Sequence, residues 1–202
     1  GGYRLNTDFH ELKTDMGRMF GFAYGEKENG AVFSHMAVMY ANALYKRGFA
    51  KEGYKALSSL YKAAMNFEVS RIYPGIPEYF TGSGRGLYHY LTGAASWYML
   101  TMVTAVYGIH GNLGNLVIAP NLMPDQYDEN GNAGLSLEFL GHEFDVLVHN
   151  SDKTEAGHAK IIDACCDGAK LENVAENSVT ILKQEIDKLA DNKRHVIEIN
   201  IR

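Results

Sequence analysis

The chain has 202 residues, of which 46% are hydrophobic and 21% charged, so it can bury a sizeable core and is not disordered. The formal net charge is −5, with eleven Lys/Arg against eight Asp/Glu in residues 1–107 and eight against sixteen in residues 108–202. This balance is too weak for a nucleic-acid surface, which needs clustered Lys and Arg, but it fits an anionic small ligand bound by the first half.

The ends and the cysteines restrict the class of protein further. The chain starts Gly1-Gly2-Tyr3 without an initiator Met, and its first 25 residues contain no signal-like apolar run, so we expect a piece of a longer protein. The adjacent Cys165 and Cys166 would point to opposite faces of an extended chain. They therefore predict neither a disulfide framework nor a metal cluster, and a reducing, cytoplasmic compartment fits best.

Three segments of the first half have helical patterns. Residues 31–47 are apolar on nearly every side and stop at Gly48, which predicts a buried helix. Residues 51–65 are apolar on one side, with Tyr54, Leu57, Tyr61 and Ala64 at helical spacing, which predicts an outer helix. Residues 92–107 predict a third, buried helix with Thr92 as its N-cap, and polar residues interrupt it too often for a membrane span. Alternating inner and outer helices suggest a double-ring barrel.

Residues 72–86 contain two prolines and four glycines, which predict a long ordered loop of the kind that carries function. Its stretch Gly82-Ser83-Gly84-Arg85-Gly86 resembles a phosphate loop. However, no strand precedes this stretch, and its spacing is wrong for a dinucleotide fingerprint or a P-loop.

After Gly108 the hydrophobic period changes from helical to alternating. The sequence predicts strands over 115–119, 135–139, 144–148 and 195–201, with turn chemistry at 128–132, while 178–189 fits a strand or a helix equally well. The fold class expected is therefore α+β, with helices first and a small antiparallel β domain second.

Polar residues gather at two expected helix starts. Asn29-Gly30 precedes an apolar run, where unpaired backbone N–H groups favour negative charge, and His35 follows within about two turns. At the second start, Thr92 can cap and Gly93 allows a close backbone approach. Alternatives remain open: His35 as a core residue, Lys27 and Glu28 as an exposed ion pair, and Gly93 as a helix-packing residue.

Two motifs, Lys27-Glu28-Asn29-Gly30 with Phe33 and His35, and Leu91-Thr92-Gly93-Ala94-Ala95 with Trp97, resemble the paired signatures of glycoside hydrolase family 94. These proteins are inverting disaccharide and oligosaccharide phosphorylases. The resemblance runs from about Gly17 to Val148. Within the family, residues 17–25 and 76–80 look closest to the 1,2-β-oligoglucan phosphorylases.

The resemblance implies a fold and a set of site residues. Residues 1–110 would be the C-terminal part of an (α/α)6 catalytic barrel, and residues 111–202 a jelly-roll-like β-sandwich. His35, Thr92 and Gly93 match the family's phosphate-binding positions, and Lys27 and Glu28 match positions that bind the sugar. Sugar contacts are also expected from Glu78 and Tyr79, and Glu78 stands where cellobiose phosphorylases have a glutamine.

The reaction implied is phosphorolysis of a β-glucosidic linkage with inversion, with inorganic phosphate as co-substrate and no cofactor or metal. Phosphate replaces the activated water of an inverting hydrolase, so one general acid suffices. That aspartate is expected upstream of this chain, so the segment should be inactive without the remaining N-terminal part of the enzyme. Partners expected are an oligosaccharide and phosphate, with no nucleic acid or membrane, and a homodimer is left open.

Two alternative functions are compatible with the same motifs. The chain could be the phosphorylase-like C-terminal region of a cyclic β-1,2-glucan synthase, or a non-catalytic carbohydrate-binding module.

Overall fold

A computed structural model describes residues 2–73, 75–89 and 92–202, so Pro74 of the expected loop and Leu91 of the second motif lie outside the described residues. The chain divides into two compact units, Gly1–Thr101 and Met102–Arg202, which are described one at a time. The composition is mixed helix and sheet, as expected for an α+β protein. In the described residues, no helix combines the length and the apolar character needed to cross a membrane.

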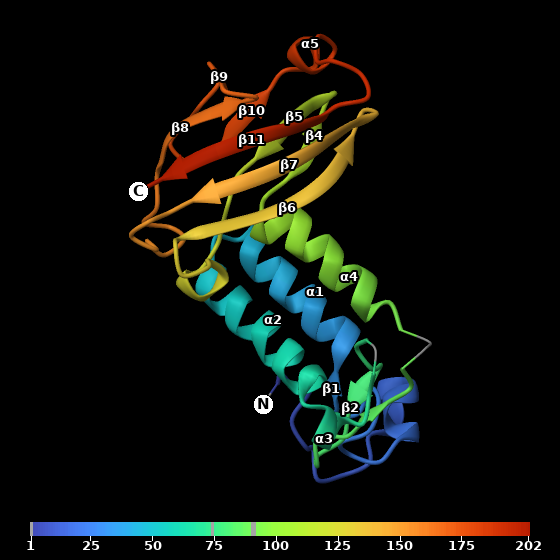
Figure 1. The fold of residues 1–202 in the computed structure, drawn as a ribbon. Helices are drawn as coiled ribbons and strands as arrows, with labels where there is room; N and C mark the ends of the chain where they lie inside the picture. The colour runs from blue at the N-terminus through green and yellow to red at the C-terminus, as the bar shows by residue number, and fades with distance from the viewer. Residues whose placement is uncertain (1, 74, 90–91) are drawn as a thin grey trace. The chain divides into compact units, whose positions relative to one another are not determined.

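The first unit is built on a helical hairpin (Figure 1). Its elements are η1 (Thr14–Gly21), α1 (Ser34–Lys46), α2 (Ala50–Met65), α3 (Phe67–Ser70) and α4 (Ala94–Thr101). Gly48 has a φ of +81° between α1 and α2, and the Phe49 N–H donates to the Leu44 carbonyl at 2.9 Å. A glycine in this conformation ends a helix, so the predicted stop at Gly48 is confirmed.

Helices α1 and α4 run parallel to each other. Near their N-terminal ends the His35 ring approaches Gly93, and near their C-terminal ends the Asn42 side chain donates to Thr101 Oγ1 at 3.2 Å. The offset between partners is nearly constant over about two turns, which requires the same direction in both helices. Both helix N-termini therefore lie at the same end of this unit (Figure 1).

A small antiparallel sheet lies at that end. Its strands are β1 (Val32–Phe33), β2 (Tyr79–Phe80) and β3 (Gly86–Leu87), in the order β1-β2-β3. The prediction of a helix starting at Asn29-Gly30 is therefore wrong, because residues 32–33 pair with β2 and the helix begins at Ser34. The expected 72–86 loop contains a short hairpin, which its Pro and Gly content hides.

The burial of the helices differs from the expectation. Helix α1 exposes Met36, Met39 and Tyr40, and α4 exposes Met99 and Leu100, so neither helix is enclosed in this chain. Helix α2 faces its neighbours with small and leucine side chains, whereas Tyr61, which the spacing places on the apolar side of this outer helix, is 51% exposed.

The second unit contains a short π-helix followed by two sheets. Its elements are η2 (Met102–Val106), β4 (His110–Asn112), β5 (Asn115–Ile118), η3 (Pro124–Gln126), β6 (Asn132–Phe139), β7 (His142–His149), β8 (Ile161–Cys166), β9 (Ala169–Lys170), β10 (Val179–Ile181), α5 (Lys183–Ile186) and β11 (Arg194–Ile201). All four predicted strands are confirmed, and the ambiguous 178–189 stretch contains a strand and then a helical turn.

One sheet has the order β10-β5-β4 and the other β6-β7-β11-β8-β9. Alternate residues of the large sheet are buried, as in Phe144, Val146, Ile197 and Ile199, and form the core of this unit. All strand pairs are antiparallel except β11 with β7, which is parallel. The small antiparallel β domain that the sequence predicts therefore contains one parallel pair.

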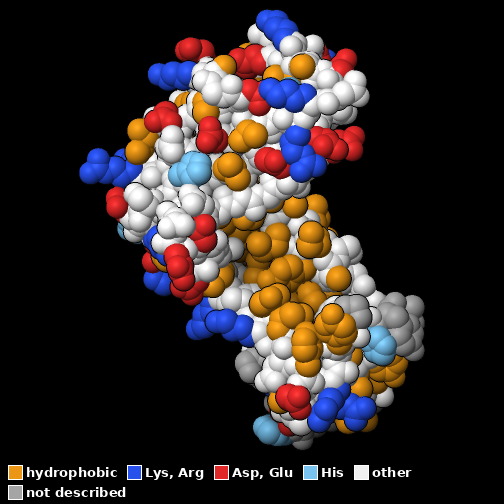
Figure 2. Space-filling model, viewed as in Figure 1, with side chains coloured by type: hydrophobic (Ala, Val, Ile, Leu, Met, Phe, Trp, Pro, Cys, Tyr) orange, Lys and Arg blue, Asp and Glu red, His pale blue; other side chains and the backbone are white. Residues whose placement is uncertain are grey.

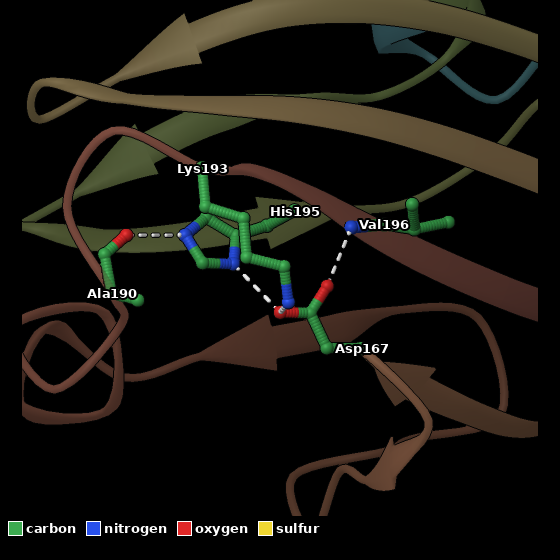
Figure 3. A network of polar contacts seen from close by, with 5 residues as sticks. All are labelled: Asp167, Ala190, Lys193, His195 and Val196. Atoms are coloured by element: carbon green, nitrogen blue, oxygen red, sulfur yellow. Dashed lines mark hydrogen bonds and ion pairs between the residues drawn. The ribbon is translucent and has the colours of Figure 1, made fainter.

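A polar network fixes the start of β11 to the turn after β8 (Figure 3). The His195 side chain is 1% exposed, with Nδ1 2.8 Å from Asp167 Oδ2 and Nε2 3.0 Å from the Ala190 carbonyl oxygen. Asp167 also accepts from Lys193 Nζ at 2.9 Å and from the Val196 N–H at 3.0 Å. These charge-assisted bonds hold the pKa of the Asp167 carboxyl well below its usual range.

Candidate functional site

The His35 imidazole lies against Gly93 at the shared end of α1 and α4. A Cβ placed on Gly93 would lie 3.0 Å from His35 Cε1, so a larger residue would push the ring away. The Trp97 ring lies on α4 with its centroid 5.9 Å from that of His35. His35 is half-buried and is the second residue of α1, closer to the helix start than the sequence indicates.

The Thr92 hydroxyl caps the start of α4. Its Oγ1 accepts a hydrogen bond from the Ala94 N–H at 3.1 Å, in agreement with the predicted capping role. The hydroxyl hydrogen can still be donated to a ligand, because the capping bond uses only a lone pair of the oxygen. Two parallel helices thus direct their N-terminal N–H groups and dipoles to the neighbourhood of His35, an arrangement that favours an anion.

Lys27 lies in a tight turn before β1. Glu26 and Asn29 pair as a bridge, and Lys27 between them has a φ of +43°. The Lys27 ammonium nitrogen is 4.2 Å from the centroid of the Tyr88 ring and 5.5 Å from that of Phe22. The two aromatic faces hold the cation by cation–π attraction at distances typical of that interaction.

Glu28 presents one paired and one unpaired carboxylate oxygen. Oε1 lies 3.2 Å from Arg18 Nη2, whereas Oε2 is buried and has no hydrogen-bond partner among the described residues. The neighbouring Asn29 side chain donates to the Phe22 carbonyl at 2.9 Å, which fixes the turn. A buried carboxylate oxygen without a donor is costly, and a sugar hydroxyl is a donor that would satisfy it.

Glu78 directly precedes β2 of the small sheet, and Tyr79 is the first residue of that strand. The Glu78 carbonyl accepts from the Ser34 N–H at 2.8 Å, which joins the start of β2 to the start of α1. The Tyr79 ring is 4% exposed and stacks on Tyr88 with centroids 6.1 Å apart. Burial, and then the negative charge of Glu26, raises the pKa of the Tyr79 hydroxyl, so Tyr79 is a neutral hydrogen-bonding group at pH 7.

The predicted residues thus form two groups. Contacts through Tyr88 bring Lys27 and Tyr79 together, and His35, Thr92 and Gly93 meet at the helix starts. The bond from Ser34 to Glu78 connects the strand that carries Tyr79 with the helix that carries His35.

Sequence reasoning did not single out Tyr88. Its place beside Lys27 depends on a φ of +54° and on the pairing of β3 with β2, neither of which has a signature in the sequence. Its only local signal is its position four residues before Thr92.

No family model matches the chain. Among curated proteins, it is similar to a cellobionic acid phosphorylase of Neurospora crassa, with 26% identity over 180 residues. The match covers 77% of this chain and 22% of the fungal protein, so the chain spans about a fifth of the length of this relative. The similarity supports a relationship with the glycoside phosphorylases that the two sequence motifs resemble.

Proposed function

We propose that this chain supplies the phosphate-binding part, and some of the sugar-binding part, of an inverting phosphorylase that cleaves β-glucosidic linkages of oligoglucans, preferably β-1,2. The observation that carries the proposal is the placement of the His35 ring against Gly93 where two parallel helices begin. The similarity to a phosphorylase supports the same general activity.

In the proposed reaction, the N–H groups at the two helix starts bind inorganic phosphate together with His35 and the Thr92 hydroxyl. A phosphate oxygen forms a bond to the anomeric carbon while the glycosidic C–O bond breaks on the opposite face. A general acid donates its proton to the departing oxygen, and the product is α-glucose 1-phosphate. Lys27 and Glu28 bind the sugar hydroxyls beside the cleaved linkage, with Glu78 and Tyr79 next to them.

The general acid and the rest of the site belong, in this proposal, to an N-terminal part of a longer protein. Figure 2 shows hydrophobic side chains gathered over the helices of the first unit. The exposed apolar side chains of α1 and α4 include Met36, Met39, Met99 and Leu100. Parallel helices α1 and α4, with α2 antiparallel to α1, support an (α/α)6 barrel that further helices complete. The β unit is then the sandwich domain that follows, and cytoplasmic location is part of the proposal.

The test is a pair of substitutions in the full-length parent protein. His35→Ala should raise the apparent KM for phosphate at least tenfold, because it removes a hydrogen-bond partner of the anion, whereas Trp97→Phe keeps an aromatic neighbour and should change it little. The readout is phosphate-dependent release of glucose 1-phosphate. Equal effects of the two variants would contradict the role of His35.

The activity itself is tested with unmodified parent protein. Absence of glucose 1-phosphate from β-1,2-, β-1,3- and β-1,4-linked glucans with phosphate would overturn the proposal. Binding of these glucans without turnover would point to a carbohydrate-binding module.

A further inference from the structure

A cavity lies on the face of the small sheet that carries Val32 and Phe80. Val32 and Phe80 pair across β1 and β2 and line it, whereas their neighbours Phe33 and Tyr79 point to the other face. The volume is about 400 Å³, and the lining also includes Arg4, Ala63, Val69, Thr81, Ser83 and Gly84. None of the seven residues assigned to phosphate or sugar binding is in this lining.

Arg4 provides the positive charge of the cavity. Its Nη1 donates to the Gly30 carbonyl at 2.6 Å, and its guanidinium carbon is 5.4 Å from the centroid of the Tyr24 ring. Its Nη2 lies 4.0 Å from the place where a Cβ on Gly82 would be. The guanidinium is thus held through Nη1 at the Gly30 carbonyl, while its Nη2 lies near Gly82 of the 81–84 loop. The lining contains no Asp or Glu, so the cavity carries a net positive charge.

The loop opposite Arg4 supplies hydroxyl groups at fixed positions. The Thr81 N–H donates to the Arg85 carbonyl and the Gly84 N–H to the Thr81 carbonyl, both at 2.9 Å. Within this turn the Thr81 and Ser83 hydroxyl oxygens are 2.9 Å apart and share one hydrogen bond. Because each hydroxyl carries one hydrogen, the pair retains one for a ligand.

Gly84 allows the loop to lie close to Val69. Gly84 has a φ of +87°, and a Cβ there would lie 2.9 Å from Val69 Cγ1. The glycine-rich stretch that resembles a phosphate loop in the sequence therefore borders a cavity with a guanidinium on its other side. The remaining wall is apolar and includes Val32, Val69 and Phe80.

We propose that this cavity binds a monosaccharide-sized ligand with one oxyanion group, such as a sugar phosphate or a sugar acid. The oxyanion lies between Arg4 and the Thr81 and Ser83 hydroxyls, since a guanidinium and hydroxyl donors together match its charge and geometry. The carbon skeleton lies against Val32 and Val69. The volume is at the lower end of the range of small-molecule sites, which suits a ligand of this size.

The experiment is calorimetric titration of the protein with glucose 1-phosphate, gluconate, inorganic phosphate and glucose. We expect at least one of the two anionic sugars to bind at least tenfold more tightly than glucose, and the stronger of the two identifies the anionic group. Arg4→Met should weaken that binding at least tenfold, because it removes a charge-assisted contact. Arg85→Met is the matched control: it also removes one guanidinium charge, but from a residue that follows the 81–84 loop and is outside the lining, so binding should persist.

A second variant is needed because Arg4→Met also removes the hydrogen bond to the Gly30 carbonyl and so disturbs that turn. Ala63→Leu narrows the cavity while leaving Arg4 in place, and it should also weaken binding at least tenfold with an unchanged circular dichroism spectrum. His35→Ala separates this cavity from the proposed phosphate site. Binding that is lost in His35→Ala and retained in Arg4→Met and Ala63→Leu would overturn the inference, as would equal affinity for glucose and both anionic sugars.

Discussion

Tyr45 carries a buried hydroxyl group without a hydrogen-bond partner among the described residues. Its side chain is 5% exposed between α1 and α2, and burial, followed by the charges of Tyr98 and Tyr54, raises the pKa of the hydroxyl well above its usual range. A buried polar group left unpaired costs free energy, so removal of the oxygen should remove this cost. Tyr45→Phe is expected to raise the free energy of unfolding by about 1 kcal/mol, measured by urea denaturation.

Tyr61 on α2 provides the control for this measurement. Its ring is 51% exposed, so Tyr61→Phe should change stability by less than about 0.5 kcal/mol. A loss of stability in Tyr45→Phe would show that its hydroxyl has a partner after all.

Gly30 is required by both its conformation and its surroundings. Its φ is +72°, and a Cβ there would lie 2.2 Å from Cε2 of the Tyr24 ring. Gly30→Ala should therefore destabilise the protein by about 3 kcal/mol, since left-handed strain and a steric clash add together.

The matched control is Gly141 in the turn between β6 and β7. Gly141 has a φ of +82°, but no atom lies within 4 Å of a Cβ placed on it. Gly141→Ala should therefore destabilise the protein only by the cost of the left-handed conformation, about 1 kcal/mol. Similar losses in the two variants, measured by thermal unfolding, would contradict the proposed clash with Tyr24.

At the scale of elements, the start of β11 depends on the Asp167 carboxylate. Both ring nitrogens of the buried His195 lie within hydrogen-bond distance of an oxygen, Nδ1 of the Asp167 carboxylate and Nε2 of the Ala190 carbonyl (Figure 3). Removing the carboxylate leaves the His195 ring, the Lys193 ammonium and the Val196 N–H without the charged oxygens that they share. Asp167→Asn is expected to lower the free energy of unfolding at pH 7 by about 2 kcal/mol, the usual size for hydrogen bonds to a charged group.

The hydrogen bonds of the Asp167 carboxylate also predict how the stability of the protein changes with pH. The pKa of Asp167 is lowered in the folded state, so its contribution is fully present above its ordinary pKa of about 3.9 and is lost as the pH falls through the lowered folded value. Chemical denaturation of the protein from pH 7 to pH 2 should show this decline, and Asp167→Asn should show a shallower one. Asp187→Asn is the control, because Asp187 pairs with Lys183 on the exposed surface and should change stability by less than about 0.5 kcal/mol.

The sequence predicts those elements whose pattern is local. Alternating apolar residues mark β7 and β11, one-sided periodicity marks α2, and Gly48 marks the end of α1. The strand β1 could not be found in this way, because two residues pair with a segment 46 to 48 positions away. The parallel pairing of β11 with β7 depends on tertiary structure, because alternating apolar residues in either strand are compatible with a parallel or an antiparallel partner.

The same limit applies to the candidate site. Residue types and motif order place His35 and Thr92-Gly93 together, and the structure brings them to one end of the unit. Spacing along the chain does not reveal Tyr88 over Lys27 or the cavity beside Arg4, because both depend on how β2 and β3 pair.

At the scale of the whole molecule, the two units differ in how they expose apolar side chains. The first exposes Met39 on α1 and Met99, 64% exposed, on α4. Exposed apolar surface of this kind binds hydrophobic dyes and promotes association. The double substitution Met39→Lys with Met99→Lys should therefore lower fluorescence of a bound naphthalene sulfonate dye severalfold without lowering Tm.

Leu113 in the β4–β5 turn is the matched control. It is 97% exposed, so Leu113→Lys adds the same charge at an isolated apolar position. Its dye fluorescence should equal that of the unmodified protein. A decrease as large as in the double variant would show that charge alone, rather than the helical surface, sets dye binding.

The position of β11 in its sheet has a consequence for how the second unit folds. The pairs β6–β7 and β8–β9 are local hairpins, yet each joins the other only through β11, which is more than 40 residues beyond the end of β7. Closing so long a loop is an entropic barrier that local contacts do not offset in advance. Assembly of the five strands should therefore be slow and all-or-none, because the two hairpins can join only when β11 pairs with both of them.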